Sequence, residues 1–306
     1  MSNPFRIGVS EKNQDAYWDV LNRGFEDAAQ RLGVVIDIRA PHTEDGTAQL
    51  RQIGELLADG VDALAVVASD TDLLSPTIAR TVAMGVPVVC FDLDAPNSKR
   101  FAHVGTLDYP DLGRAAATAL ASVLPPSSEV LVQVGSRHAH GALGKAEGFR
   151  SEIERLGHHV AEVTFDAHND QEAEEQAAEA LSRNPNIAGL FGVYGYHPGA
   201  QARASRHLPT GRRPRIVGFD LLPATLAGLE DGTIHASIWL QEYYFGYLTT
   251  ALLHNMLKLG VAETALLCGF TVEEPARNRL TIEPILVTRD ELDRLRPRLR
   301  QLGVIT

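Results

Sequence analysis

The feature that most constrains the fold is an alternation of short apolar runs with amphipathic helical segments, which occurs twice along the chain. The pattern begins at residues 5–32, where an apolar run that ends at Val9 is followed by a polar loop and then by apolar residues at helical spacing. Further runs of this first array predict strands at residues 34–38, 62–67, 86–91 and 100–104. Strands that alternate with helices favour a parallel sheet covered by helices on both faces.

The second array has the same organisation. It predicts strands at residues 129–134, 159–165, 187–193, 215–219 and 235–240, an extended segment at 280–287 and an amphipathic helix at 290–302. Because each array is long enough to bury a core of its own, the 306 residues are expected to form two domains. We therefore predict an α/β protein with two similar doubly wound parallel-sheet (Rossmann-like) lobes.

The borders of the two lobes depend on where the chain crosses from one to the other. Short extended segments near Val104, Ile238 and Leu267 are the candidates. Three such crossings predict a three-strand hinge about which the lobes open and close. The predicted N-terminal lobe comprises residues 1–105 and 238–265, and the predicted C-terminal lobe comprises residues 106–237 and 266–306.

Charge and composition exclude several classes of partner. The formal net charge is −11, and Lys and Arg form no continuous run, which argues against a nucleic acid as partner. No apolar stretch approaches the roughly 18–20 residues of a membrane span. The start of the chain also lacks the charged and apolar regions of a signal peptide. Either the protein is cytoplasmic, or it had a targeting segment that has been removed.

The motif content argues against an enzyme with a metal or a cofactor, and we expect neither group. GxSxG, GxxxxGK[ST] and HExxH are absent, and no Gly-rich phosphate loop follows the first strand. Cys90 and Cys268 form neither a disulfide framework nor a metal cluster, although a bridge between them is left open. His138 and His140 have the spacing of two metal ligands on an extended loop, but no third ligand is marked. Hydrogen bonding to a ligand and exposure on a solvated loop are the alternatives for this pair.

Polar residues cluster where predicted strands end, and open parallel sheets bind their ligands at these carboxyl ends. Asp92 and Asp220 each directly follow an apolar strand, in VVCFD and IVGFD. The loop after the first strand contains Asn13, Gln14, Asp15, Tyr17 and Trp18. These residues are the first candidates for ligand contacts.

Several stretches, taken in order, resemble the ribose-binding-like (type I) periplasmic solute-binding proteins of sugar ABC transporters. They are IGVSEKNQDAYWDVLNRGFEDAAQRLG, DGVDALAVVASDTDLLSPTIARTVAMGVPVVCFDLD, GKAEGF, NPNIAGLFGVYG, RIVGFDLLP and LEDGTIHASIWLQEYYFGYL. The resemblance covers essentially the whole chain, and its specificity lies in the order and spacing of the stretches. It implies a non-enzymatic protein that captures a sugar in the cleft between two lobes and presents it to the membrane subunits of an ABC importer.

The resemblance also assigns roles to particular residues. Tyr17 and Trp18 hold the positions that sandwich a sugar ring, where an aromatic face stacks on apolar C–H groups. Core aromatics at the start of a helix are the alternative for this pair. Asp92 and Asp220 hold the positions whose carboxylates accept hydrogen bonds from ligand hydroxyls, with helix capping or hinge stabilisation as the alternative. Asp94 either shares that role or lies on a solvated loop.

Departures from the family pattern point away from ribose itself. Leu93 stands where the ribose binder has Arg, Tyr194 where Asn is common, and His168 where an aromatic is common. The usual cleft Arg is missing from its place, and the same loop offers Arg137, His138 and His140 instead. Trp239 and Gln241 flank the position where a Gln is usual. Together these residues are compatible with another monosaccharide, a polyol or a related hydroxylated compound.

Two other classes of function remain as alternatives. One is the ligand-sensing core of a lactose-repressor-type regulator, or a periplasmic sensor partner, but only four residues precede the first strand, too few for a helix-turn-helix. The other is an α/β enzyme with an unrecognised site. The transport interpretation predicts a monomer that is periplasmic, or extracellular and lipid-anchored, with its signal segment absent from this chain.

Overall fold

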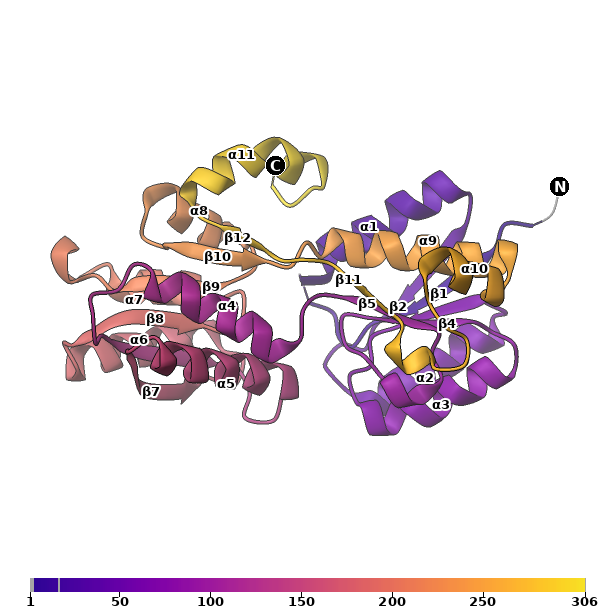
Figure 1. Cartoon of the computed structure of the whole chain (residues 1–306), viewed down its shortest axis with the longest axis horizontal. Helices are drawn as coiled ribbons and strands as arrows, with labels where there is room; N and C mark the ends of the chain where they lie inside the picture. The colour runs from indigo at the N-terminus through magenta and orange to yellow at the C-terminus, as the bar shows by residue number, and fades with distance from the viewer. Residues whose placement is uncertain (1–2, 16, 306) are drawn as a thin grey trace. The chain divides into compact units, whose positions relative to one another are not determined.

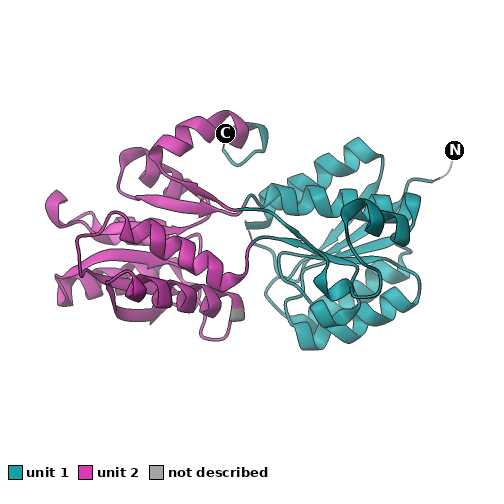
Figure 2. Cartoon of the chain, in the orientation of Figure 1, with its two compact units in different colours: residues 1–106, 241–283, 301–306 teal, residues 107–240, 284–300 magenta. Residues whose placement is uncertain are grey.

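The structure is a computed structural model that describes residues 3–15 and 17–305, apart from the side chain of His140. The chain divides into two compact units (Figure 2). Unit 1 comprises residues 1–106, 241–283 and 301–306, and unit 2 comprises residues 107–240 and 284–300. The chain therefore passes between the units after residues 106, 240, 283 and 300.

Unit 1 is built on a six-stranded sheet with the order β11-β5-β4-β3-β1-β2, in which neighbouring strands are parallel. Its strands are β1 (Arg6–Ser10), β2 (Val35–Arg39), β3 (Ala63–Val66), β4 (Val88–Phe91), β5 (Ala102–Gly105) and β11 (Arg279–Thr281). Its helices are α1 (Tyr17–Leu32), α2 (Gly46–Ala58), α3 (Thr71–Ala83), α9 (Tyr243–Leu259) and α10 (Val261–Cys268), with short 3-10 turns η1 (Pro96–Ser98) and η3 (Pro275–Arg277). In Figure 1, α1 and α9 lie on one face of this sheet and α2 and α3 on the other.

Unit 2 repeats this plan with a six-stranded sheet of order β12-β10-β9-β8-β6-β7. Its strands are β6 (Glu129–Val134), β7 (His159–Phe165), β8 (Ile187–Gly192), β9 (Arg215–Phe219), β10 (Ala236–Trp239) and β12 (Ile285–Val287). Neighbouring strands are parallel except β12, which pairs antiparallel with β10 at the edge. Its helices are α4 (Tyr109–Ala121), α5 (His140–Arg155), α6 (Asp170–Arg183), α7 (His197–Ser205), α8 (Pro223–Asp231) and α11 (Arg289–Gln301), with the 3-10 turn η2 (Thr210–Arg212).

Burial of the strands explains why their sequences show no alternation of polar and apolar residues. Every residue of β3, β4 and β5 is buried, because helices cover both faces of the sheet. The edge strand β2 carries no fully buried residue. The two predicted parallel-sheet lobes are therefore confirmed.

Glycines let one pair of helices in each unit cross in close contact. In unit 1, a Cβ atom built on Gly24 of α1 would lie 2.0 Å from the carbonyl oxygen of Tyr243 of α9. In unit 2, a Cβ atom built on Gly113 of α4 would lie 2.0 Å from the carbonyl oxygen of Lys145 of α5. A larger residue at either glycine would push the two helices apart.

The structure differs from the predicted lobe borders in the C-terminal third of the chain. Leu267, where the third crossing was expected, lies inside α10, and residues 266–283 belong to unit 1. Because β11 pairs with β5, this segment completes the sheet of unit 1, and the chain leaves only after residue 283. The predicted extended segment 280–287 is in fact two short strands, β11 and β12, in different sheets. Residues 238–240 lie in unit 2 and residues 301–306 in unit 1.

Candidate ligand-binding site

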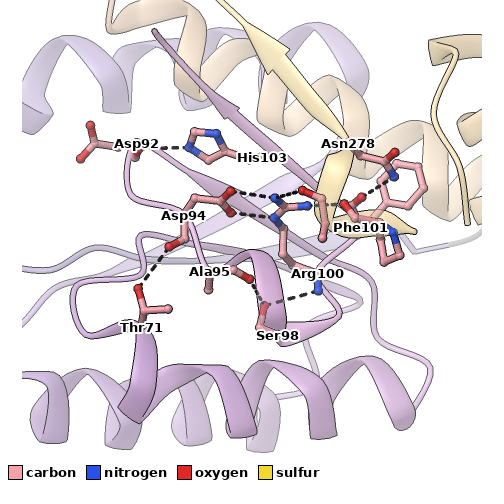
Figure 3. A network of polar contacts seen from close by, with 11 residues as sticks. Thr71, Asp92, Asp94, Ala95, Ser98, Arg100, Phe101, His103 and Asn278 are labelled. Carbon is pink, nitrogen blue, oxygen red and sulfur yellow. Dashed lines mark hydrogen bonds and ion pairs between the residues drawn. The ribbon is translucent and has the colours of Figure 1, made fainter. Parts of the chain in front are cut away.

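In unit 1, Asp92 directly follows β4 at the carboxyl edge of the sheet, with a left-handed φ of 58° that Asp tolerates better than most residues. Its N–H donates to the carbonyl oxygen of Val104 in the neighbouring strand at 3.1 Å. The Nε2 atom of His103 lies 3.0 Å from the carbonyl oxygen of Asp92 (Figure 3), and since a carbonyl only accepts, Nε2 carries the proton. Burial lowers the pKa of His103, which keeps the ring neutral. The Asp92 side chain accepts a hydrogen bond from the Tyr17 hydroxyl at 3.2 Å.

The aromatic pair that follows β1 splits into two environments. Trp18 is 2% exposed, packs its ring edge-on against Phe91, and donates from Nε1 to Oδ1 of Asn13 at 2.7 Å. Trp18 therefore occupies the core position that was the alternative to sugar stacking. Tyr17 is only partly buried and points its hydroxyl at Asp92, so it remains the candidate contact of this pair.

The polar residues of the same loop hold the loop itself. The Asp15 carboxylate accepts from the N–H of Tyr17 at 3.0 Å, at the start of α1. Gln14 donates to the carbonyl oxygen of Ala40 at 3.2 Å, and its Oε1 lies 3.0 Å from Nδ1 of His42. Both Gln14 and Asp15 are exposed, so their remaining surface is open to a ligand.

Asp94 has a structural role in unit 1 (Figure 3). Its two carboxylate oxygens accept from Nε and Nη2 of Arg100, each at 2.7 Å. The Arg100 side chain is fully buried and also donates to the carbonyl oxygens of Pro275 at 2.5 Å and Ala276 at 3.2 Å. Asn278 adds a hydrogen bond from Nδ2 to the carbonyl oxygen of Phe101 at 2.8 Å. Asp94 therefore holds the Arg100 guanidinium, whose other hydrogen bonds tie the segment before β11 to unit 1. Neither alternative predicted for Asp94 from the sequence included this role.

Asp220 repeats the geometry of Asp92 in unit 2. It directly follows β9 with a φ of 64°, and its N–H donates to the carbonyl oxygen of Ile238 in the neighbouring strand at 3.0 Å. The hydroxyl of Ser237 donates to the carbonyl oxygen of Asp220 at 2.7 Å. Each sheet thus presents one Asp carboxylate at its carboxyl edge on a backbone held by the neighbouring strand.

The loops after β6, β7 and β8 bring aromatic and basic side chains to the same edge of unit 2. The rings of His168 and Tyr194 meet edge to face with centroids 4.9 Å apart, His168 being exposed and Tyr194 partly buried. The exposed guanidinium of Arg137 lies 4.0 Å from the ring centre of Phe165, a cation–π contact. His138 is exposed, and the side chain of His140, the first residue of α5, lies outside the described part of the chain.

The last two predicted contacts lie near passages of the chain between the units. Trp239 is 1% exposed in β10, and the Arg298 guanidinium carbon of α11 lies 5.7 Å from its ring centre, so it packs in the core of unit 2. Gln241 has a left-handed φ of 63° and donates from Nε2 to the carbonyl oxygen of Glu283 at 2.6 Å. That bond joins the first and last residues of the 241–283 segment of unit 1.

Two buried carboxyl groups that directly follow a strand escaped the sequence analysis. Glu11 directly follows β1 and is 3% exposed; burial raises its pKa to about 8, opposed by a hydrogen bond with Asn22 and reinforced by Asp19. Asp166 directly follows β7 and accepts hydrogen bonds from Tyr196 and His197. The available signal was their position, because each follows a predicted strand as Asp92 and Asp220 do.

The described part of the chain offers no grouped metal ligands, no disulfide and no membrane-spanning helix. Among the described residues, no three or more His, Cys, Asp or Glu side chains are grouped so as to hold a metal ion. Cys90, buried in β4 with a pKa raised by burial to about 12, and Cys268, exposed at the end of α10, are both free thiols. No helix within the described ranges is both long and apolar enough to cross a membrane.

Comparison with known proteins places the chain in a family. Residues 7–261 match the family described as "Periplasmic binding protein domain", and the chain belongs to that family. It is similar to the ribose import binding protein RbsB of Bacillus subtilis (strain 168), with 24% identity over 83% of this chain and 82% of RbsB.

Solved structures share the fold. An ABC transporter solute-binding protein from Burkholderia graminis, in complex with D-arabinose, has a TM-score of 0.83 at 22% identity, covering 95% of this chain and 98% of that one. A solute-binding protein from Agrobacterium vitis bound to α-D-tagatopyranose has a TM-score of 0.80 at 19% identity, covering 97% and 98%. At these identities the likeness concerns the fold.

Proposed function

We propose that this protein binds a monosaccharide, a polyol or a related hydroxylated compound and delivers it to the membrane subunits of an ABC importer. The family match, a ribose import binding protein among its relatives, and fold neighbours in complex with D-arabinose and α-D-tagatopyranose support this proposal. The protein acts outside the cytoplasmic membrane, as a monomer, and returns its ligand chemically unchanged.

The observation that carries the proposal is the matched pair Asp92 and Asp220. Both follow a central strand, both have a left-handed φ, and both have their carbonyl oxygen held from the neighbouring strand. A carboxylate that accepts from several sugar hydroxyls forms charge-assisted hydrogen bonds, which are stronger than bonds between neutral groups. We propose that each of these two carboxylates is placed to accept hydrogen bonds from sugar hydroxyls.

The other predicted contacts are assigned by their exposure. Tyr17 and Tyr194 keep part of their rings accessible and are proposed to pack against the ligand, with exposed His168 beside Tyr194. Trp18, Trp239 and Asp94 are set aside, because the first two are core residues and the third is held by Arg100. The remaining proposed polar contacts that are at least partly exposed are Asn13, Gln14, Asp15, Arg137 and His138. Gln241 is 8% exposed and bonded to Glu283, and the side chain of His140 lies outside the described residues, so exposure does not support a ligand contact for either.

A thermal-shift screen against monosaccharides, alditols and aminated or acidic sugars tests the proposal. A ligand present at 100 times its Kd adds about 2.7 kcal/mol to the free energy of unfolding, which gives a clear rise in Tm. We expect at least one neutral sugar or alditol to do so. No shift across the whole panel would contradict sugar binding and favour another small molecule.

Two further measurements separate the proposal from its alternatives. Mass spectrometry of the ligand after prolonged incubation is expected to recover it intact, whereas a chemically changed product would show an enzyme. Analytical ultracentrifugation is expected to show a monomer with and without ligand. An obligate dimer would favour the regulator-type interpretation.

A further inference from the structure

Asp166 joins two neighbouring side chains in the interior of unit 2. It is 1% exposed and directly follows β7. Its Oδ2 accepts from Nε2 of His197 at 2.7 Å, and its Oδ1 accepts from the hydroxyl of Tyr196. Burial alone would raise the pKa of Asp166, but these donors hold it below its usual range, so the carboxylate stays ionised.

The first arm of this network reaches the backbone of Tyr194. The N–H of Tyr194 donates to Nδ1 of His197 at 3.0 Å, so Nδ1 carries no proton and the proton is on Nε2, directed at Asp166. Burial lowers the pKa of His197, which keeps the ring neutral with this single tautomer. Through His197, Asp166 therefore fixes the peptide group of Tyr194.

The second arm reaches the ring of Tyr194. The Tyr196 ring lies beside the Tyr194 ring, with centroids 5.9 Å apart and planes 28° apart, while the Tyr196 hydroxyl is held by Asp166. These rings and that of His168 meet at Gly135, just beyond β6. A Cβ atom built there would lie 2.7 Å from the Tyr196 hydroxyl, 2.9 Å from Cε2 of Tyr194 and 3.0 Å from Nδ1 of His168.

We infer that Asp166 is a positioning residue of the candidate site: buried away from the ligand itself, it orients Tyr194 for stacking on a sugar ring. This inference rests on the proposed function. An aromatic face stacks on the apolar C–H face of a closed ring, and an open-chain alditol offers no such rigid face. Asp166 therefore contributes to selectivity for ring-form sugars over the matching alditols.

Two substitutions at the same position separate the hydrogen bonds from the charge. Asp166→Ala removes the acceptor of both arms. Asp166→Asn keeps the geometry, because its Oδ1 accepts from His197 Nε2 and its Nδ2 donates to the Tyr196 oxygen, whose hydroxyl hydrogen turns away. A matched control is Phe149→Leu in the core of unit 2, where Phe149 stacks on Phe191 with centroids 4.1 Å apart. It lowers Tm without touching the network.

Isothermal titration at 20 °C, well below each variant's Tm, is used with the pair D-arabinose and arabitol, or with the sugar that gives the largest thermal shift and its alditol. We expect Asp166→Ala to raise Kd for the sugar by about tenfold or more and to reduce its preference over the alditol. Asp166→Asn is expected to restore Kd to within about threefold of wild type, and Phe149→Leu to leave it unchanged. Wild-type affinity and selectivity in Asp166→Ala would overturn the inference.

If Asp166→Ala does not fold, Tyr196→Phe serves in its place, because it removes one donor and keeps the ring. We expect it to raise Kd by about threefold to tenfold and to lower the preference for the ring sugar. Unchanged selectivity would overturn the inference equally. Failure of the proposed function is distinguishable, because then wild type binds no member of the sugar panel, whereas failure of the inference alone leaves wild-type binding intact.

Discussion

Each unit fixes the backbone of one Asp at its sheet edge in the same way, but the residues around that Asp differ between the units. Asp92 and Asp220 each have the carbonyl oxygen bonded from the neighbouring strand, by His103 in unit 1 and by Ser237 in unit 2. His103 pairs with the residue two before Asp92, and Ser237 with the residue two before Asp220, so the registers are equivalent. The backbone geometry of the carboxylate is therefore common to both units even though the donor is an imidazole in one and a hydroxyl in the other.

The large side chain stands at a different position of the strand in each unit. A Cβ atom built on Gly105 would lie 2.4 Å from the His103 ring, so the large His103 requires the small residue two positions on. In unit 2 the order is reversed, with small Ser237 followed two positions on by Trp239, which is 1% exposed. Residues two apart on a strand share a face, so the shape around each Asp differs between the two units.

A larger contrast between the units lies in two buried carboxyl groups that directly follow strands, Glu11 in unit 1 and Asp166 in unit 2. Glu11 and Asp166 both directly follow a parallel strand, yet burial raises the pKa of Glu11 to about 8, while donors outweigh burial at Asp166 and lower its pKa. At neutral pH Glu11 is mainly protonated and Asp166 is ionised. The protonation state of a buried carboxyl group thus depends on its hydrogen-bond donors more than on how deeply it is buried.

The largest expected effect tests which acidic side chain of unit 1 is structural. Asp94→Ala leaves the buried guanidinium of Arg100 without its carboxylate, and we expect a loss of about 3–5 kcal/mol in the free energy of unfolding. Urea unfolding measures it. Asp111→Ala is the control, since Asp111 pairs with Arg114 on the surface of α4, and such pairs contribute about 0–1 kcal/mol. Equal losses in the two variants would contradict the structural role of Asp94.

The next effect sharpens the contrast between Glu11 and Asp166. Because the pKa of Glu11 is raised to about 8, the folded state binds more protons than the unfolded state between about pH 4.5 and 8. Stability is therefore lost as pH rises through this window, by at most about 1.4 kcal/mol per pH unit from this group. Glu11→Gln removes that loss and is expected to raise stability by a few kcal/mol at pH 8 and little at pH 4.5.

Urea unfolding of both proteins at pH 4.5, 6, 7 and 8.5 measures the difference. Glu26→Gln, the same chemical change at an exposed position of α1, is the control and is expected to follow wild type. A Glu11→Gln curve that runs parallel to wild type across the window would show that Glu11 is ionised in the folded state at neutral pH.

Much of this architecture was predictable from sequence, because buried strands and amphipathic helices leave direct periodic signals. The parallel-sheet lobes and the positions of Asp92 and Asp220 followed from those signals. The split of residues 280–287 between two sheets did not, because a three-residue strand such as β11 has no periodicity of its own and is defined by its pairing with β5.

The site was predictable at the level of loops and less so at the level of side chains. Adjacent Tyr17 and Trp18 share one sequence signal, but only the structure separates a partly exposed ring from one that is 2% exposed. The pairing of Asp166 with His197 joins residues 31 apart in sequence, a contact that no local spacing rule encodes. Polar pairs between residues far apart in the sequence could be identified only from the structure.

Ligand affinity tests whether Asp92 and Asp220, at the carboxyl edges of the two sheets, play the same role in binding. We expect Asp220→Ala to weaken binding of the best sugar by about 2 kcal/mol, because ligand hydroxyls lose a charged acceptor in a desolvated site. Calorimetry measures it, with Asp220→Asn as the control that tolerates the left-handed backbone. Asp92→Ala is expected to have an effect of the same sign. Unchanged affinity for either variant would remove that residue from the site.

The smallest expected effect concerns Tyr17, whose hydroxyl donates to the Asp92 carboxylate at 3.2 Å. Tyr17→Phe keeps the ring and removes only this donor, so a loss of about 0.5–1 kcal/mol in affinity is expected, with stability changed by no more. Calorimetry on Tyr17→Phe, alone and combined with Asp92→Ala, measures the coupling. If Tyr17 orients Asp92 toward the ligand, its effect disappears once Asp92 is gone. A rise in affinity for Tyr17→Phe would instead mean that the hydroxyl competes with the ligand for the carboxylate.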